Sequence, residues 1–448
     1  MKEKLSVKQY LVLSSMLFGL FFGAGNLIFP IHMGQLAGNR FALAAGGFCI
    51  TGVGLPLLGI VAIGVSESNG LFDLGSKAGK GFSYFFTIVL YLTIGPLFAI
   101  PRTATVSYQV GIASFVPVGR EKFALFLFSL LFFTIVLIFS LRPSGIMTWI
   151  GKLLNPIFLV FLAIIVVAVF VKPMGGAANA AAIGSYADRS FITGLLEGYN
   201  TMDALASLAF GIILIESVRR LGITQPGKIS IVTMRSGVLT VLLMAIIYGA
   251  LTYAGSQSVE ILPMAKDGGL AFYQIAQYYF GTLGGILLGI TITFACLKTA
   301  IGLVTACGET FAELLPFKFR YRTYAIGFCL FSFGIANIGL EKIIAFSVPV
   351  LKFLYPITIV LILTGIVGVL FHYDKTVFRT TITVTTATAV LELLSALPNT
   401  VQMSIPGWKT VGSLYRHLPL GAYGMGWMLP AGLGFLVGIC IYIRRRNK

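Results

Sequence analysis

Three residues near the N-terminus interrupt an apolar stretch and could hold a small charged molecule. Gly23, Gly25 and Asn26 stand in the middle of residues 18–30. Each disfavours a continuous helix, glycine through backbone entropy and asparagine through hydrogen bonds to its own backbone. A helix broken inside a membrane frees N–H and C=O groups, which are tolerated only where they line a cavity or hold a ligand. The amides suit an anion such as a carboxylate, and the carbonyls with the Asn26 side chain suit a small cation. The competing interpretation is a small-residue face for helix packing.

A second polar cluster interrupts the apolar stretch that covers residues 190–216. Its members are Glu197, Gly198, Tyr199, Asn200, Thr201, Met202 and Asp203. Polar groups inside an apolar span are costly and usually functional. The backbone here could receive a substrate ammonium group, and the residues that follow could wall an apolar pocket. Two interpretations of Asp203 stay open: a direct role in the site, or the N-cap of the following helix.

Two basic residues fall inside apolar spans, Arg102 and Lys298. A cation near the centre of a membrane helix costs about 2.5–3.5 kcal/mol on insertion scales. Each should therefore have a partner or a task. Glu197 and Asp203 are the candidate partners of Arg102.

The other reactive residue types form no recognisable site. His32, His372 and His417 are isolated, and the cysteines lie inside apolar runs without metal-binding or redox spacing. Glu309 and Glu313 are interpreted as part of an ion-pair network with the cations that follow them. Phosphate-binding loops and the GxSxG and HExxH motifs are absent from the sequence. We expect neither an enzyme nor a cofactor, and the concentration of polar residues at two breaks disfavours a channel.

The composition places these residues in a membrane. Hydrophobic residues make up 57% of the chain and charged residues 10%, and the mean hydropathy is +0.94. No soluble domain of this length could bury so much apolar surface. The net charge of +17 would suggest nucleic acid in a soluble protein, but here the charges lie between apolar spans and indicate membrane topology. We expect a lipid bilayer around the chain, no nucleic acid and no obligate protein partner.

Hydrophobic length predicts an all-α polytopic protein with about twelve transmembrane helices. They are expected near residues 10–36, 41–65, 83–114, 123–141, 145–171, 190–216, 230–255, 281–311, 323–339, 342–371, 378–397 and 424–443. Lys and Arg are about twice as frequent in the loops that share a side with the N-terminus as in the others. Both termini are therefore expected in the cytoplasm.

The breaks indicate an internal repeat. The first and sixth spans each carry Gly and Asn in their middle, and residues 101–104 of the third span resemble residues 297–300 of the eighth. The offset is five spans both times. Because five is odd, the two copies must have opposite orientations in the membrane. Broken helices at matching positions of inverted halves point to the central site of a transporter.

Long motifs carry a resemblance to a known family. They are residues 23–30, residues 95–107, residues 197–211, residues 347–350 and residues 429–430. With them the chain resembles, over nearly its whole length, the bacterial branched-chain amino acid carrier family (BrnQ-type, or LIVCS), within the amino acid–polyamine–organocation superfamily. This resemblance implies one transmembrane transporter domain with the leucine-transporter-type five-plus-five inverted repeat and broken helices 1 and 6. The repeats would cover residues 10–172 and 190–371, with two peripheral helices in residues 378–443.

The resemblance also implies roles for individual residues at the first break. Residues 23–26 resemble the Gly-Leu-Gly-Asn of sodium-coupled members of the wider fold. The amides of Ala24 and Gly25 would then hold the substrate carboxylate. Asn26 would lie near a cation or the substrate.

An ion site between the first and eighth spans is implied in the same way. Residues 294–300 resemble a segment that supplies hydroxyl groups to Na⁺, so the expected Na⁺ ligands are Gly19, Phe22, Ala295 and Thr299. Lys298 departs from this pattern, since it stands where a hydroxyl is expected. Its ammonium could replace or compete with Na⁺ and make coupling proton-dependent, or it could face away while Na⁺ still binds.

The expected function is secondary import of leucine, isoleucine and valine across the bacterial cytoplasmic membrane by alternating access, coupled to Na⁺ or H⁺. The alternative is an ion-independent or exchange-type carrier of other small neutral amino acids. Apolar groups from the third, sixth and eighth spans would hold the aliphatic side chain. Pocket size and unpaired polar groups would exclude larger or polar substrates.

Overall fold

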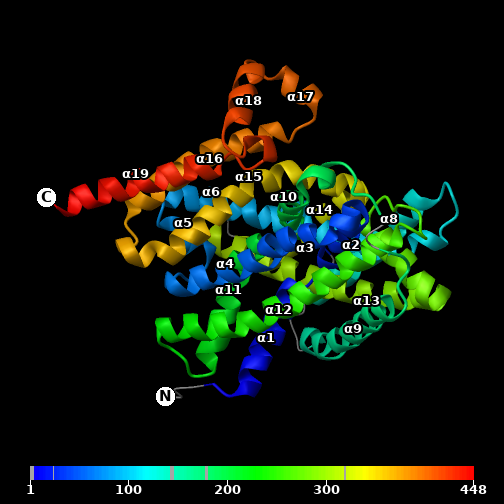
Figure 1. Cartoon of the computed structure of the whole chain (residues 1–448). Helices are drawn as coiled ribbons and strands as arrows, with labels where there is room; N and C mark the ends of the chain where they lie inside the picture. Colours follow the sequence, from blue (N-terminus) through cyan, green and yellow to red (C-terminus); the bar gives the residue numbers. More distant parts are fainter. Residues whose placement is uncertain (1–4, 24, 142–145, 177–179, 317–318, 448) are drawn as a thin grey trace.

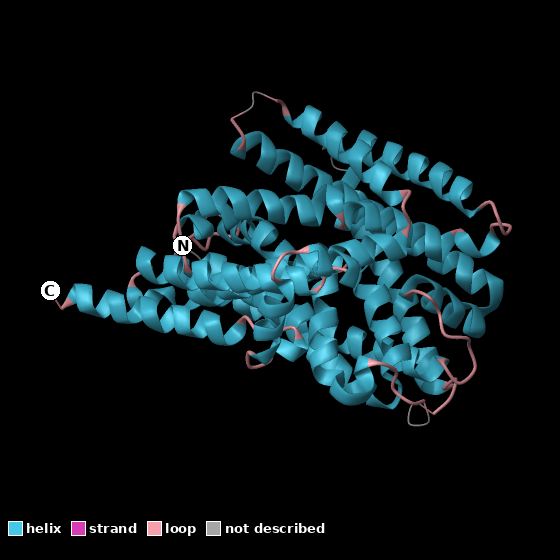
Figure 2. Cartoon of the chain, turned by 90° about the horizontal axis from the view of Figure 1, so that it is seen from above, coloured by secondary structure: helices cyan, strands magenta, loops and turns pink. Residues whose placement is uncertain are grey.

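The computed structural model describes residues 5–23, 25–141, 146–176, 180–316 and 319–447. The described residues are helical or lie in the loops between helices (Figure 2). The α-helices are α1 (Val7–Phe21), α2 (Gly25–Ala37), α3 (Phe41–Cys49), α4 (Leu55–Val65), α5 (Leu71–Ser76), α6 (Lys80–Leu92), α7 (Ala99–Gly111), α8 (Glu121–Leu141), α9 (Ile146–Val171), α10 (Ser185–Glu197), α11 (Asp203–Arg220), α12 (Pro226–Ser258), α13 (Gly268–Leu314), α14 (Tyr321–Ala336), α15 (Leu340–Val367), α16 (Lys375–Ser395), α17 (Asn399–Ser404), α18 (Trp408–His417) and α19 (Met428–Arg446).

Short 3-10 and π-helical segments join or interrupt several of these helices. The 3-10 segments are η1 (Gly38–Arg40), η4 (Ala113–Phe115), η5 (Gly198–Thr201), η6 (Gly368–Phe371) and η7 (Gly421–Tyr423), and the π segments are η2 (Ile50–Gly54) and η3 (Thr93–Leu97). Mid-helix segments of these kinds often mark functional or strained positions.

The helices confirm the prediction of an all-helical membrane protein. Eight helical stretches among the described residues are long and apolar enough to cross a membrane, and the other predicted spans coincide with shorter or broken helices. Large apolar side chains such as Ile246 and Leu283 are 67% and 73% exposed, as expected for surfaces that face lipid. The chain is therefore a multi-pass membrane protein.

Both predicted breaks are present. Helix α1 ends at Phe21 and α2 begins at Gly25. Helix α10 ends before η5, and Met202 then takes a left-handed conformation (φ 62°) ahead of α11. A non-glycine residue in this region costs about 1–3 kcal/mol, and such strain clusters at functional sites.

Two interruptions that the hydrophobic pattern does not reveal shape the third and eighth spans. Gly95 is non-helical within η3, between α6 and α7. Gly281 (φ 63°) bends α13. The part of α13 before Gly281 thus takes a different direction from the long part that follows. The bend at Gly95 thus divides the third span, and the bend at Gly281 stands at the start of the eighth.

Close backbone contacts fix the helices that carry the breaks. A side chain on Gly34 of α2 would place its Cβ 2.0 Å from the carbonyl oxygen of Thr252 in α12. A side chain on Gly289 of α13 would place its Cβ 2.5 Å from the Cα of Gly111 in α7. Small residues permit such approaches between membrane helices. Helix α2, which follows the first break, is therefore packed closely against α12, and α7 is packed closely against α13.

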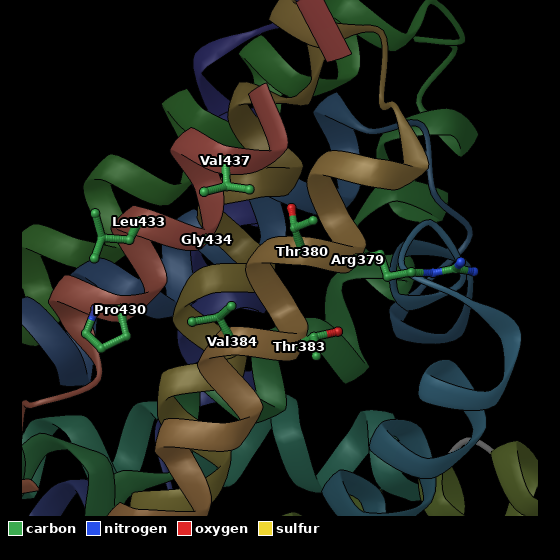
Figure 3. A pocket seen from close by; sticks show the side chains of 8 residues that line it. All are labelled: Arg379, Thr380, Thr383, Val384, Pro430, Leu433, Gly434 and Val437. Carbon is green, nitrogen blue, oxygen red and sulfur yellow. The ribbon is translucent and has the colours of Figure 1, made fainter. Parts of the chain in front are cut away.

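The C-terminal helices form the periphery of the molecule. Helices α16 and α19 pack against each other, and α17 and α18, which connect them in the chain, project away from them at the top of Figure 1. A shallow groove of about 450 Å³ lies between α16 and α19 (Figure 3). Its walls are almost wholly apolar, and its residues are Arg379, Thr380, Thr383, Val384, Pro430, Leu433, Gly434 and Val437. It shares no residue with the broken helices.

Candidate functional site

Asn26 joins the two breaks. Its side-chain oxygen accepts a hydrogen bond from the Gly23 amide (2.9 Å). Its side-chain nitrogen donates to the Asp203 carboxylate and to the Tyr248 hydroxyl of α12. Asn26 and Asp203 are both buried, so these bonds lie in an environment where an unpaired polar group is costly. One side chain thereby connects the start of α2, the start of α11 and α12.

Asp203 does not cap α11. Met202 holds the N-cap position, and the Asp203 amide donates instead to the Thr201 hydroxyl (3.3 Å). The carboxylate stays directed at Asn26. Of the two interpretations of Asp203, the geometry agrees with a direct role in the site.

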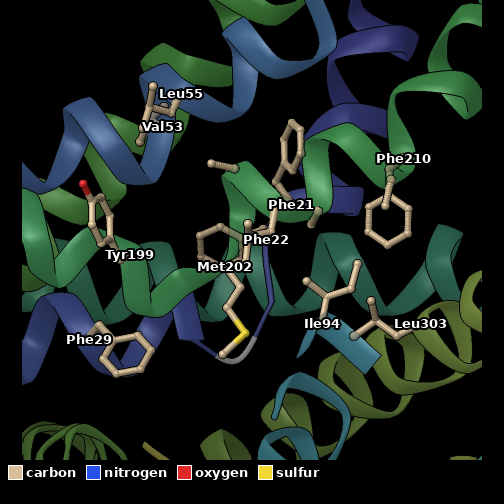
Figure 4. Close-up of a cluster of buried hydrophobic side chains, with 14 of the residues drawn as sticks. Phe21, Phe22, Phe29, Val53, Leu55, Ile94, Tyr199, Met202, Phe210 and Leu303 are labelled. Carbon is tan, nitrogen blue, oxygen red and sulfur yellow. The ribbon is translucent and has the colours of Figure 1, made fainter. Parts of the chain in front are cut away.

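A central cavity of about 50 Å³ lies at the meeting point of the breaks. It is lined by Phe21, Gly23, Gly25, Asn26, Ile94, Ala99, Arg102, Thr103, Thr201, Met202, Asp203, Ala206, Phe210, Thr299 and Leu303. Its polar part is formed by the two breaks with Arg102, and its apolar part by α1, η3, α11 and α13 (Figure 4). In Figure 4, Ile94 and Leu303 lie side by side, near Phe210. The cavity therefore offers charged groups at one end and an aliphatic or aromatic wall at the other.

The structure places the predicted substrate residues in two groups. Gly23, Gly25, Asn26, Thr201 and Asp203 line the central cavity. Ala24 lies outside the described residues.

The remaining three predicted residues face other helices. Gly198 approaches η2 closely, since a Cβ there would lie 2.0 Å from the Thr51 hydroxyl. Tyr199 stacks on Tyr355 of α15, with 3.9 Å between ring centroids. Asn200 contributes its backbone carbonyl, which accepts a hydrogen bond from Arg102 (2.6 Å).

Arg102 is a buried cation without a carboxylate at contact distance. It forms no ion pair with Glu197 or Asp203. Among the described residues, an ion pair within 4.0 Å is found between Lys266 and Glu341, and both of these side chains are exposed. The guanidinium of Arg102 lies 5.1 Å from the ring centroid of Phe29. Its partners on the protein are therefore a carbonyl oxygen and an aromatic face.

The residues predicted for ion coupling gather around a second, smaller cavity. It has a volume of about 10 Å³, and its lining residues are Phe18, Gly19, Phe22, Leu159, Ala295, Lys298 and Thr299. Asn26, also predicted there, lines the central cavity instead. The volume is close to that of one water molecule or small ion.

The oxygen atoms that line this smaller cavity suit a cation, and the ammonium group of Lys298 already lies among them. The Thr299 hydroxyl donates to the Ala295 carbonyl (3.1 Å) and keeps its oxygen lone pairs available. The Lys298 ammonium donates to the Gly19 carbonyl (3.5 Å). Carbonyl and hydroxyl oxygens suit a small hard cation, but an ammonium at the same carbonyl repels a second positive charge.

A larger cavity of about 740 Å³ approaches the central cavity from one side. Its residues are Asn69, Gly70, Leu71, Phe72, Tyr84, Thr87, Tyr91, Ala209, Ile213, Glu216, Arg219, Ala306, Glu309, Thr310, Glu313 and Leu314. The central cavity begins about one helical turn further along the same helices. Glu309 and Glu313 form no ion pair among the described residues, so the ion-pair network expected for them is absent from that part of the chain.

Several lining residues could not be identified from the sequence. Ile94, Ala206, Phe210 and Leu303 come from the third, sixth and eighth spans, as expected for the apolar wall, but nothing in an apolar run marks which members face the cavity. Tyr248 was missed because a tyrosine in a long apolar helix has the pattern of an ordinary core aromatic.

Comparison with known proteins gives concordant matches. Residues 6–445 match the family described as branched-chain amino acid transport protein. The chain is 49% identical to the branched-chain amino acid permease BrnQ of Lactobacillus delbrueckii subsp. lactis, covering 98% of this chain and 97% of the relative. It is 41% identical to the branched-chain amino acid permease BraB of Bacillus subtilis, covering 98% of this chain and 96% of that relative. Among solved structures, MhsT in complex with L-phenylalanine matches with a TM-score of 0.57 at 14% identity, covering 98% of this chain and 99% of that one.

Proposed function

Because the chain belongs to the family of branched-chain amino acid transport proteins, we propose that it imports leucine, isoleucine and valine across the bacterial cytoplasmic membrane. The observation that carries this proposal is the cavity at the junction of two broken helices, with Asn26 and Asp203 at its polar end. The fold shared with MhsT agrees with a carrier built around such a junction. The names of the relatives describe transporters and no enzyme.

The charged ends of the substrate would lie at the breaks. The Gly25 amide at the start of α2 would hold the carboxylate, because a helix N-terminus favours negative charge; the Ala24 amide, which lies outside the described residues, is expected to do the same. Asp203 would face the ammonium group. The aliphatic side chain would extend between Ile94 and Phe210, where each buried CH₂ contributes about 0.8 kcal/mol.

Alternating access is the mechanism that the cavities support. The central cavity of about 50 Å³ has room for only a few water molecules, at roughly 10–15 Å³ each, so it must widen to hold leucine. The larger cavity lies on the side of the N-terminus by helix count. With both termini in the cytoplasm, it would be the inner vestibule. The inverted halves, residues 10–172 and 190–371, would move against each other, with residues 378–443 outside them.

The coupling ion would occupy the smaller cavity. Either Na⁺ binds Gly19, Phe22, Ala295 and Thr299, or the Lys298 ammonium fills the place of that ion and coupling is to H⁺. The bond from Lys298 to the Gly19 carbonyl favours the second arrangement. Exchange without a coupling ion is the remaining alternative.

Uptake into proteoliposomes tests the proposal. We expect saturable leucine uptake that isoleucine and valine inhibit, and counterflow when the vesicles are preloaded with unlabelled leucine. Flux that rises linearly with concentration and shows no counterflow would exclude a carrier. Saturable uptake of other neutral amino acids alone would assign a different substrate class.

A further inference from the structure

Arg102 has unused hydrogen-bonding capacity inside the central cavity. It is 4% exposed and lies on α7. A guanidinium carries five N–H donors. Among the described residues it donates one hydrogen bond, from Nη1 to the Asn200 carbonyl (2.6 Å). A buried cation with unfilled donors and no carboxylate at contact distance is an incomplete arrangement.

The free side of the guanidinium is directed at the start of α2. Its Nη2 lies 3.1 Å from the position that a Cβ on Gly25 would occupy. The N-terminus of a helix has partial positive charge, so a cation is unfavourable there. The cavity therefore brings together a guanidinium and the positive end of α2, and α11 presents a second positive end from the other break.

The carboxylate of the cavity does not pair with the free edge of Arg102, since the two form no ion pair within 4.0 Å. Asp203 lines the same cavity, but it is the first residue of α11 and already accepts a hydrogen bond from Asn26. The cavity thus has a surplus of positive charge on the side of Arg102 and Gly25. That place therefore favours an anionic group.

We propose that Arg102 binds the carboxylate of the transported amino acid. This inference rests on the proposed function and extends it: the carboxylate is held by a side chain of α7 as well as by the amides of α2. A carboxylate between Nη2 and the start of α2 fills the free donors, and the ammonium then lies toward Asp203. A zwitterion brings a carboxylate to Arg102 and an ammonium group to Asp203 and adds no net charge to the cavity.

The fixed orientation of Arg102 makes it selective for compounds that carry a carboxylate. The bond to Asn200 holds one edge of the guanidinium, and the ring of Phe29 lies 5.1 Å from its Cζ. Because Gly25 has no side chain, a carboxylate can approach the other edge. Amines and amides that lack the carboxylate leave Arg102 unpaired and bring a second positive charge, so the site must reject them.

Competition binding with purified protein in nanodiscs tests this inference. Labelled leucine is displaced by unlabelled leucine or by leucinamide, in which an amide replaces the carboxylate. In the wild type we expect leucinamide to bind at least 100-fold more weakly than leucine. In Arg102→Gln, the affinity for leucine should fall by about 10- to 150-fold, which corresponds to the loss of a hydrogen bond to a charged group. The affinity for leucinamide should stay at the wild-type value or rise. The preference for leucine then falls to a few-fold.

A matched control is Lys352→Gln, which removes another cation from a membrane-spanning helix, α15, outside the central cavity. Both affinities should stay at wild-type values. If Arg102→Gln keeps the wild-type preference, the inference is wrong although leucine transport stands. If the wild type binds no branched-chain amino acid, the proposed function itself fails.

Arg102→Lys decides the case in which Arg102→Gln does not fold. The ammonium keeps the charge but lacks the planar fork. We expect leucine binding to weaken while leucinamide binding stays unchanged, so that the preference for leucine falls below the wild-type value but stays above that of Arg102→Gln. Equal weakening of both ligands would show that Arg102 only supports the fold.

Discussion

The side-chain amide of Asn26 donates a hydrogen bond to the carboxylate of Asp203, a residue 177 positions away in the chain. The bond closes the gap between two helices that each break in mid-membrane. Because both residues are buried, the polar end of the cavity forms only when both breaks are in place. The site is therefore a property of the assembled fold.

Replacing Asn26 by Ala should abolish leucine uptake. The change removes one hydrogen-bond partner from the Gly23 amide, from the Asp203 carboxylate and from the Tyr248 hydroxyl, and a buried polar group left unsatisfied costs about 1–3 kcal/mol. We expect uptake per folded molecule to fall at least 100-fold. Gln35→Ala is the matched control, because Gln35 is also a buried amide of α2 that bonds to α12, through Ser258. It should lower the unfolding temperature but keep uptake; equal loss of uptake in both variants would contradict the special role of Asn26.

Lys298 should determine the coupling ion. Its ammonium lies at the Gly19 carbonyl, where Na⁺ would otherwise bind. We expect wild-type uptake to follow an imposed proton gradient without sodium. Lys298→Thr should lose that dependence and gain stimulation by sodium. Strict sodium dependence of the wild type that the substitution leaves unchanged would rule out this assignment.

Enlarging Ala206 should change the order of substrates. Ala206 lines the small central cavity, so Ala206→Leu fills space that the substrate needs, and overpacking costs about 1–3 kcal/mol. The KM for leucine should rise by about 5- to 150-fold, and the KM for valine by less. Ala209→Leu, on the same helix but at the larger cavity, should leave the ratio of the two KM values unchanged. A parallel rise for both substrates would show that Ala206 does not contact the side chain.

Two glycines of α12 should respond in opposite ways to a methyl group. A Cβ on Gly255 would lie 2.0 Å from the carbonyl oxygen of Ile31, whereas a Cβ on Gly249 meets nothing within 4 Å. Gly255→Ala should separate α12 from α2 and lower both the unfolding temperature and the yield of folded protein. Gly249→Ala should be neutral or stabilising by up to ~1 kcal/mol. Thermal unfolding in detergent measures both, and similar values for the two variants would contradict the tight contact.

The sequence was informative where residue type limits the backbone. Gly25 and Asn26, and the cluster before Asp203, identified both breaks because they interrupt apolar runs. Thr103 and Thr299, which stand at matching places in residues 101–104 and 297–300, line the same cavity, while the internal repeat stays a prediction.

Side-chain direction could not be predicted in the same way. Asn26 faces the cavity, while Tyr199 stacks on α15, although both stand at a break. The partner of Arg102 was sought among the acids, yet it is the Asn200 carbonyl. Which carbonyl a break leaves free depends on the local φ and ψ angles, and these are set by tertiary packing around Met202.

Thr299 lines both the central cavity and the smaller one beside it. With one hydroxyl forming part of two walls, any occupant that shifts this side chain changes the binding free energy of the other occupant. Thermodynamic linkage requires any such effect to be reciprocal, so an ion bound as proposed would gain from the amino acid the same factor in affinity that the amino acid gains from the ion. That factor is therefore a single quantity shared by the two ligands, and titrating either ligand at several fixed concentrations of the other would measure it.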